Sequence, residues 1–154
     1  MRLIQPSAVW AAESALYAMP GFTLTEARGL LGRVFAPWVQ ALNLSVESIE
    51  ADGAILKMPG SPSLAREGGV ISGQALMALA DTAMVFAVSA ACGRYRPMTT
   101  VDQTSHFLKP ATGDIIADAR IIRLGKTMAF GRVTLTAAAD GKPVAIATSA
   151  CALL

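Results

Sequence analysis

The chain has 154 residues and a formal net charge of +2, with 13 lysines and arginines against 11 aspartates and glutamates. That length suits one domain with a real core and is too short for two domains of ordinary size. The charge excess is far below that of a dedicated nucleic-acid binder, so we expect no nucleic-acid partner.

The chain is also unusually apolar, with 53% hydrophobic and only 16% charged residues. A monomer of this size would not comfortably bury so much apolar surface, so we expect an obligate oligomer. Cys92 and Cys151 stand alone, without the spacing of a disulfide framework or a zinc site. Pro6 and Glu13 interrupt the apolar residues near the N-terminus, which is unlike a signal peptide. We therefore expect a cytoplasmic protein.

Residues 1–42 are predicted to form a helical extension that precedes the main domain at 43–154. The run SAVWAAESALYAM at 7–19 has helical spacing. The run TLTEARGLLGRVF at 23–35 begins with a threonine and a glutamate in the spacing of a capping box. A short third helical piece follows at 36–42. We expect these segments to cover a sheet edge or to join a subunit interface, since nothing in them indicates catalysis.

The main domain begins with a pattern typical of strands. Residues 43–59 alternate polar and apolar side chains and turn at the letters ADG, which predicts a hairpin. The loop GSPSLAREGG follows. Four more strand-like runs occupy 98–154, and the links ATG, GK and DG separate them. Short links of this kind are expected to join antiparallel neighbours, because a parallel crossover needs a longer connection.

The stretch GQALMALADTAMVFAVSAAC, residues 73–92, is nearly continuous apolar sequence with a single charge, Asp81. Its alanines, leucines and methionines favour a helix that is apolar all round, as in a membrane span or a helix enclosed by protein. A single span would leave this carboxylate without a partner in the bilayer, although residues 70–92 are long enough to cross one. We therefore predict an α+β fold in which an antiparallel sheet of about six strands wraps around this helix, with the membrane span as the alternative.

The stretches SGQALMALADTAM and TTVDQTSHFLKPATGDIIADARIIRLGK resemble the hotdog-fold acyl-CoA thioesterases, and within them the PaaI-type group related to phenylacetate degradation. In that group the helix signature begins His-Gly-Gly and closes on Leu-Ala-Asp-Thr-Ala, which stands here at 79–83. Aligned on Asp81, the first family glycine falls on Gly73, while Ser72 and Gln74 replace the histidine and the second glycine. The resemblance implies a hotdog fold, hydrolysis of acyl-CoA, active sites shared across a homodimer, and pairing of dimers into a homotetramer.

Gly73 and Asp81 are the principal candidate catalytic residues, and Ser72 and Gln74 are further candidates beside them. The first N–H groups of a helix lack intrahelical partners, so the Gly73 amide can bind the thioester oxygen. Asp81 can act as a general base or as a nucleophile. Eight residues of helix separate the two by about 12 Å, which is too far for joint action on one carbonyl. Gly73 of one subunit should therefore work with Asp81 of another, and a monomer should be inactive.

Coenzyme A is part of the substrate, and its phosphates need cations to bind them. We expect no separate cofactor and no metal. The second half of the chain, 93–154, holds eight lysines and arginines against four acids, so an anionic ligand should meet that half. The candidate coenzyme A contacts in the strand and turn region are Lys109, Arg120, Arg123 and Lys126. A non-catalytic acyl-CoA-binding protein with the same fold remains the alternative function.

Overall fold

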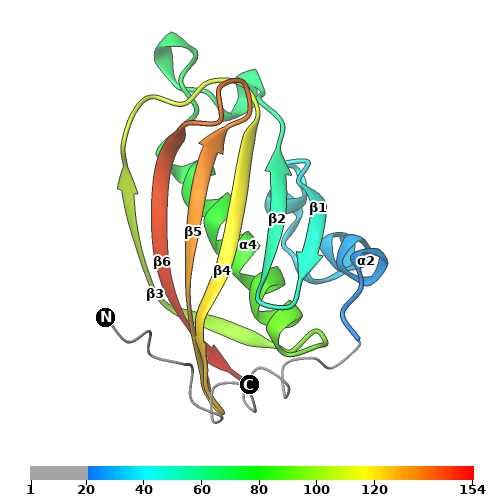
Figure 1. The fold of residues 1–154 in the computed structure, drawn as a ribbon. Helices are drawn as coiled ribbons and strands as arrows, with labels where there is room; N and C mark the ends of the chain where they lie inside the picture. Colours follow the sequence, from blue (N-terminus) through cyan, green and yellow to red (C-terminus); the bar gives the residue numbers. More distant parts are fainter. Residues whose placement is uncertain (1–20) are drawn as a thin grey trace, which may run out of the picture.

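In the computed structural model, residues 21–154 are described, and they form a six-stranded antiparallel sheet against a long helix (Figure 1). The order across the sheet is β1-β2-β4-β5-β6-β3. The predicted fold class is confirmed. The α-helices of these residues are α2 (Leu24–Val34), α3 (Pro37–Gln40) and α4 (Gly73–Ala91), two 3-10 helices lie at Pro62–Leu64 and Glu67–Gly69, and the strands are β1 (Ser45–Glu50), β2 (Gly53–Met58), β3 (Met98–Phe107), β4 (Ile115–Leu124), β5 (Met128–Ala137) and β6 (Pro143–Leu153).

The helix predicted at 23–35 is confirmed as α2, and its start is set by a capping box. The Thr23 hydroxyl accepts a 3.2 Å hydrogen bond from the backbone amide of Glu26. In return, the Glu26 carboxylate accepts a 2.7 Å hydrogen bond from the backbone amide of Thr23. Ala27 and Leu30 are buried, and the helix packs against β1. The helix predicted at 7–19 lies outside the described residues, and the boundary between 42 and 43 stays a prediction.

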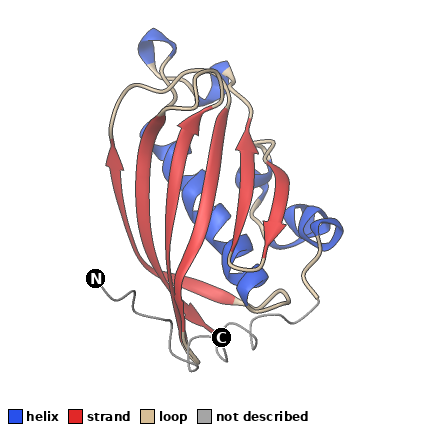
Figure 2. Ribbon diagram, viewed as in Figure 1, coloured by secondary structure: helices blue, strands red, loops and turns tan. Residues whose placement is uncertain are grey.

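The hairpin predicted at 43–59 is confirmed, but the prediction that the ATG link joins neighbouring strands is wrong. β3 pairs with β6 rather than with β4. The seven residues between Phe107 and Ile115 therefore cross the ends of two intervening strands. At about 3.3 Å per extended residue they easily span three strand spacings of about 4.8 Å. As a result β3 lies at the edge of the sheet, and its outer edge is unpaired within the described chain (Figure 2).

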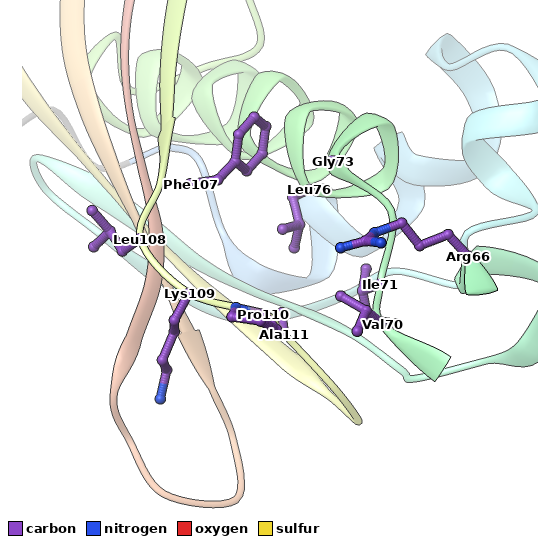
Figure 3. Close-up of a pocket in the computed structure, with 10 residues that line it drawn as sticks. All are labelled: Arg66, Val70, Ile71, Gly73, Leu76, Phe107, Leu108, Lys109, Pro110 and Ala111. Atoms are coloured by element: carbon purple, nitrogen blue, oxygen red, sulfur yellow. The ribbon is translucent and has the colours of Figure 1, made fainter. Parts of the chain in front are cut away.

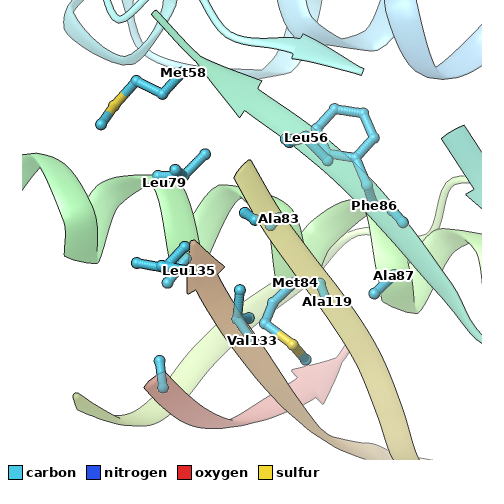
Figure 4. Close-up of a cluster of buried hydrophobic side chains, with 14 of the residues drawn as sticks. Leu56, Met58, Leu79, Ala83, Met84, Phe86, Ala87, Ala119, Val133 and Leu135 are labelled. Atoms are coloured by element: carbon cyan, nitrogen blue, oxygen red, sulfur yellow. The ribbon is translucent and has the colours of Figure 1, made fainter. Parts of the chain in front are cut away.

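α4 lies against one face of the sheet, and its large side chains form the core. Leu79, Met84 and Phe86 are fully buried and pack toward the strand residues Leu56 and Val133 (Figure 4). By length and composition this helix could cross a membrane, yet 72% of its apolar window is buried inside the protein. The sheet that covers these side chains therefore accounts for their apolar character.

Leu79→Ala is expected to lower the free energy of unfolding by about 2–5 kcal/mol, because it removes three carbons from a packed site and leaves a cavity. Leu79 has no exposed surface. Val34→Ala, at an exposed site on α2, should change the same quantity by less than about 0.5 kcal/mol. Urea denaturation of both variants measures the difference. Equal effects would show that the interface between α4 and the sheet does not carry the stability of the fold.

Candidate functional site

One stripe of α4 is left open by the sheet of its own chain. Gln74 and Met77 are exposed, and Ala78, Asp81 and Val85 are partly buried, while most of the helix is fully buried. Spacings of three and four residues place this set on one face. The stripe runs beside β3, because the Met77 carbonyl accepts a 3.2 Å hydrogen bond from Gln103 Nε2 of that strand.

Asp81 lies in the open stripe and is held by β3. Thr100 Oγ1 donates a 2.7 Å hydrogen bond to Asp81 Oδ1. Among residues 21–154, Oδ2 has no hydrogen-bond partner. The register between β3 and β6 shifts between Thr100 and Asp102, so Val101 is an extra residue that bends the strand at this point. One carboxylate oxygen is thus fixed and the other is available for chemistry.

Cys151 lies next to this carboxylate without competing with it as a reactive group. It pairs with Thr100 in the β3–β6 register and is almost fully buried. Burial, and then the negative charge of Asp81, raises the pKa of the Cys151 thiol. The thiol therefore stays protonated at neutral pH and is a poor nucleophile. No group of three or more His, Cys, Asp or Glu residues that could hold a metal ion occurs among the described residues.

The N-terminus of α4 presents two free amides. Ser72 is the N-cap, and its hydroxyl accepts a 3.3 Å hydrogen bond from the Ala75 amide. In the described part of the chain, the N–H groups of Gly73 and Gln74 have no acceptor, as expected for the first turn of a helix. The Gln74 side chain is exposed. The Phe107 ring lies over Gly73, since a Cβ added at this glycine would come 3.2 Å from Phe107 Cζ. Gly73 therefore lies at the C-terminal end of β3.

A pocket of about 470 Å³ opens beside Gly73, between the loop that precedes α4 and the segment that follows β3 (Figure 3). Its walls are mainly apolar and include Val70, Ile71, Leu76 and Phe107. Two cations, Arg66 and Lys109, also line it. Asp81 does not line this pocket, so a single chain does not join the two halves of the predicted site. Lys109 is one of the predicted coenzyme A contacts, whereas Arg66 is not.

Two of the predicted coenzyme A cations are paired with carboxylates of the same chain. Lys109 Nζ lies 3.3 Å from Asp140 Oδ2. Arg120 binds three acids on the β1–β2 hairpin and on its own strand, and its hydrogen bond to Glu50 is the first cause of its raised pKa. The three acids are Glu50, Asp52 and Asp118. Arg120 thus holds strands together and has little capacity left for a phosphate.

The four predicted cations do not form one cluster within a chain. The Lys109 amide bonds to the carbonyl of Val144 at the start of β6. Lys126 lies at the other end of that strand, because Thr127 beside it bonds to the Leu153 amide. Nine residues of strand separate these two points by about 30 Å. Arg123 is exposed near the end of β4, at the same end of the sheet as Lys126.

Residues 68–144 match the family model of the thioesterase superfamily. A candidate esterase of Halobacterium salinarum is 32% identical over 104 residues, which cover 64% of this chain and 69% of that protein. The chain therefore belongs to the thioesterase superfamily, and the family and this relative support hydrolase activity on thioesters.

Solved structures show the same fold. A candidate thioesterase of Silicibacter sp. TM1040 is 25% identical, with a TM-score of 0.78 and coverage of 88% of this chain and 94% of that one. Zebra fish thioesterase superfamily member 2 is 24% identical, with a TM-score of 0.77 and coverage of 87% and 100%. A mutant of the phenylacetic acid degradation protein PaaI from Thermus thermophilus is 24% identical, with a TM-score of 0.68 and coverage of 77% and 100%. The fold is thus the hotdog fold of the thioesterases.

Proposed function

We propose that this protein hydrolyses acyl-CoA thioesters at a site made by two subunits, with Gly73 from one and Asp81 from the other. The observation that carries the proposal is the placement of the two residues at opposite ends of one edge strand. Gly73 lies against Phe107 at the C-terminal end of β3, and Asp81 is held by Thr100 near its N-terminal end.

Pairing of two β3 edges about a two-fold axis would bring these ends together. Antiparallel strands place the end of one beside the start of the other. The Phe107 end of one subunit would then adjoin the Thr100 end of its partner, so that Gly73 faces the partner's Asp81. A ten-residue edge strand whose outer backbone groups are unpaired within residues 21–154 is a natural site for such pairing. The apolar side chains of Val101, 60% exposed, and Met77, 43% exposed, would be covered by it.

The chemistry follows from the two halves of the site. The amides of Gly73 and Gln74 donate hydrogen bonds to the thioester oxygen and stabilise the oxyanion that forms there. Asp81 Oδ2 takes a proton from a water molecule, whose oxygen bonds to the carbonyl carbon, or attacks that carbon itself. The carbon–sulfur bond then breaks, and coenzyme A leaves as its thiol after protonation. When Asp81 itself has attacked, a water molecule then hydrolyses the mixed anhydride between the acyl group and Asp81, which frees the acid. Thr100 keeps the other carboxylate oxygen in place in either route, and no cofactor beyond the substrate takes part.

The same pairing supports a site for the coenzyme A phosphates. In this pairing Lys109, just after the C-terminal end of β3 in one subunit, would lie near the end of the partner's sheet that carries Arg123 and Lys126. Arg120 is the exception, because three carboxylates already surround it.

Ile122 and Phe130, exposed on β4 and β5, offer apolar surface for a second dimer. We therefore propose a homodimer as the minimal active unit, a homotetramer as the assembly, and a cytoplasmic location without a membrane or nucleic-acid partner.

Complementation between two inactive variants tests the shared site. Asp81→Asn retains Gly73, and Gly73→Pro retains Asp81, so a hybrid dimer contains one intact site. Co-expression in equal amounts should restore about a quarter of wild-type turnover, because about half of the random dimers are hybrids with one working site of two. Thiol release from acyl-CoA by the co-expressed mixture measures this recovery, and the tag-purified hybrid, which has one intact site of two, should reach about half of wild-type turnover. A hybrid as inactive as both parents would mean that each chain builds its own site.

A further inference from the structure

Arg66 is a cation that the proposed hydrolysis does not use. It is exposed, and its side chain makes no ion pair or hydrogen bond with any residue of 21–154. It nevertheless lines the pocket beside Gly73. In Figure 3 its side chain runs from the loop across the pocket toward Leu76, so that the guanidinium lies over the apolar wall. An unpaired guanidinium in this position is available to a ligand group of opposite charge.

The backbone places Arg66 close to the start of α4. The Ser72 amide bonds to the Leu64 carbonyl at 2.8 Å, Ala65 and Ile71 form a bridge, and the Arg66 amide bonds to the Val70 carbonyl at 2.8 Å. Arg66 therefore lies opposite Val70, three residues before Gly73. The three residues from Val70 to Gly73 span about 10 Å of extended backbone. The Arg66 side chain points toward the helix, so its guanidinium lies closer to Gly73 than the Arg66 backbone does.

Lys109 does not serve the pocket in the same way. Its ammonium group is paired with Asp140, and Figure 3 shows its side chain pointing away from the other residues that line the pocket. Arg66 is thus the unpaired cation among the residues that line this pocket in the described chain. Between its guanidinium and Gly73 the wall is apolar, with Ile71, Leu76 and Phe107. Such a wall suits a short methylene chain.

We propose, on the basis of the proposed hydrolysis, that this pocket binds an acyl group that ends in a second carboxylate, and that Arg66 binds this carboxylate. With the thioester carbonyl at the Gly73 amide, the short distance to Arg66 matches a chain of a few methylene groups. The diphosphate of coenzyme A is the other anion of the substrate. It lies at the far end of the long pantetheine arm, which reaches well beyond Arg66 from the same carbonyl. The preferred substrates are therefore monothioesters of short dicarboxylic acids.

Calorimetric binding in an Asp81→Asn background tests this preference without consuming the ligand. The probes are succinyl-CoA and glutaryl-CoA, with butyryl-CoA and valeryl-CoA as neutral counterparts of equal chain length. Adding Arg66→Gln should weaken binding of the two dicarboxylic thioesters by about 10- to 100-fold, and leave the neutral pair unchanged. Arg66→Lys should retain part of the preference, because it keeps the charge and loses the bidentate geometry. Arg132→Gln, which removes an exposed cation on β5, is the matched control.

Three results would overturn the proposal. One is an unchanged affinity for the dicarboxylic thioesters in Arg66→Gln, and another is the same loss for Arg132→Gln. The third is an equal loss for all four thioesters, which would mean that Arg66 binds a coenzyme A phosphate. Thiol release by the wild-type protein reports separately on hydrolysis. Without thiol release, a charge-dependent binding preference would still support the role of Arg66; hydrolysis of neutral substrates without that preference would support the proposed function alone.

Discussion

Asp81→Asn is expected to lower kcat for thioester hydrolysis by about 10²- to 10⁴-fold, the usual contribution of a positioned general base. An amide has nearly the shape of the carboxylate and can still bond to Thr100, so packing should be preserved. It can neither take a proton from water nor attack the carbonyl, because it lacks the negative charge. Thiol release from a panel of acyl-CoAs measures kcat, and calorimetry with the same panel should show binding close to that of the wild type.

Glu47→Gln is the matched control for this loss of a carboxylate. Glu47 is exposed on β1, at the opposite edge of the sheet from β3, and should leave kcat unchanged. Full turnover by Asp81→Asn would remove Asp81 from the mechanism. A wild-type protein that binds acyl-CoA without thiol release would instead be the non-catalytic binding protein. That alternative is favoured by Ser72, whose hydroxyl is used as a helix cap where the family has a histidine.

Gly73→Pro is expected to lower kcat by about 10²- to 10³-fold, as does the removal of one oxyanion donor in other hydrolases. Proline lacks the N–H group but is well tolerated at the first position of a helix. Ser72 has φ −65° and ψ 147°, an extended conformation that suits a residue before proline. The helix should therefore remain intact while the donor is lost. Circular dichroism checks the helix, and thiol release measures the rate.

Gly73→Ala separates the loss of the amide from the added bulk. It keeps the N–H and places a Cβ 3.2 Å from the Phe107 ring. That ring is half-exposed at the end of an edge strand and can move by a few tenths of an ångström. We expect a loss of less than about tenfold, because the donor geometry is kept. If proline and alanine at this position had equal rates, the Gly73 amide would not be the oxyanion donor.

Most helices and strands of the described chain could be predicted, because their signals are local. The capping box at Thr23, the period-two pattern of 43–59 and the alanine-rich run before Cys92 each report on a few consecutive residues. The neighbour of β3 could not be predicted in this way. Its link to β4 is short enough for a hairpin, and only the pairing of β3 with β6 shows that the link crosses the sheet.

The site could be predicted in part for the same reason. Gly73 and Asp81 share one helix, so their spacing was readable from the sequence. Thr100 and Arg66 were missed, because neither belongs to a local pattern that points to a ligand. Thr100 reaches Asp81 from a strand 19 residues away. Arg66 reaches the pocket because the loop before α4 folds back on itself at Ala65 and Ile71.

The amino-acid sequence by itself determined the long apolar helix with its single carboxylate, the start of that helix at Gly73, and the separation of about 12 Å that one helix imposes. The tertiary structure decided which strand became the edge and which stripe of α4 stayed uncovered. Backbone periodicity acts over a few residues, whereas strand order depends on how the whole sheet buries α4. Through that order, Asp81 meets Thr100 and Gly73 meets Phe107 at opposite ends of β3.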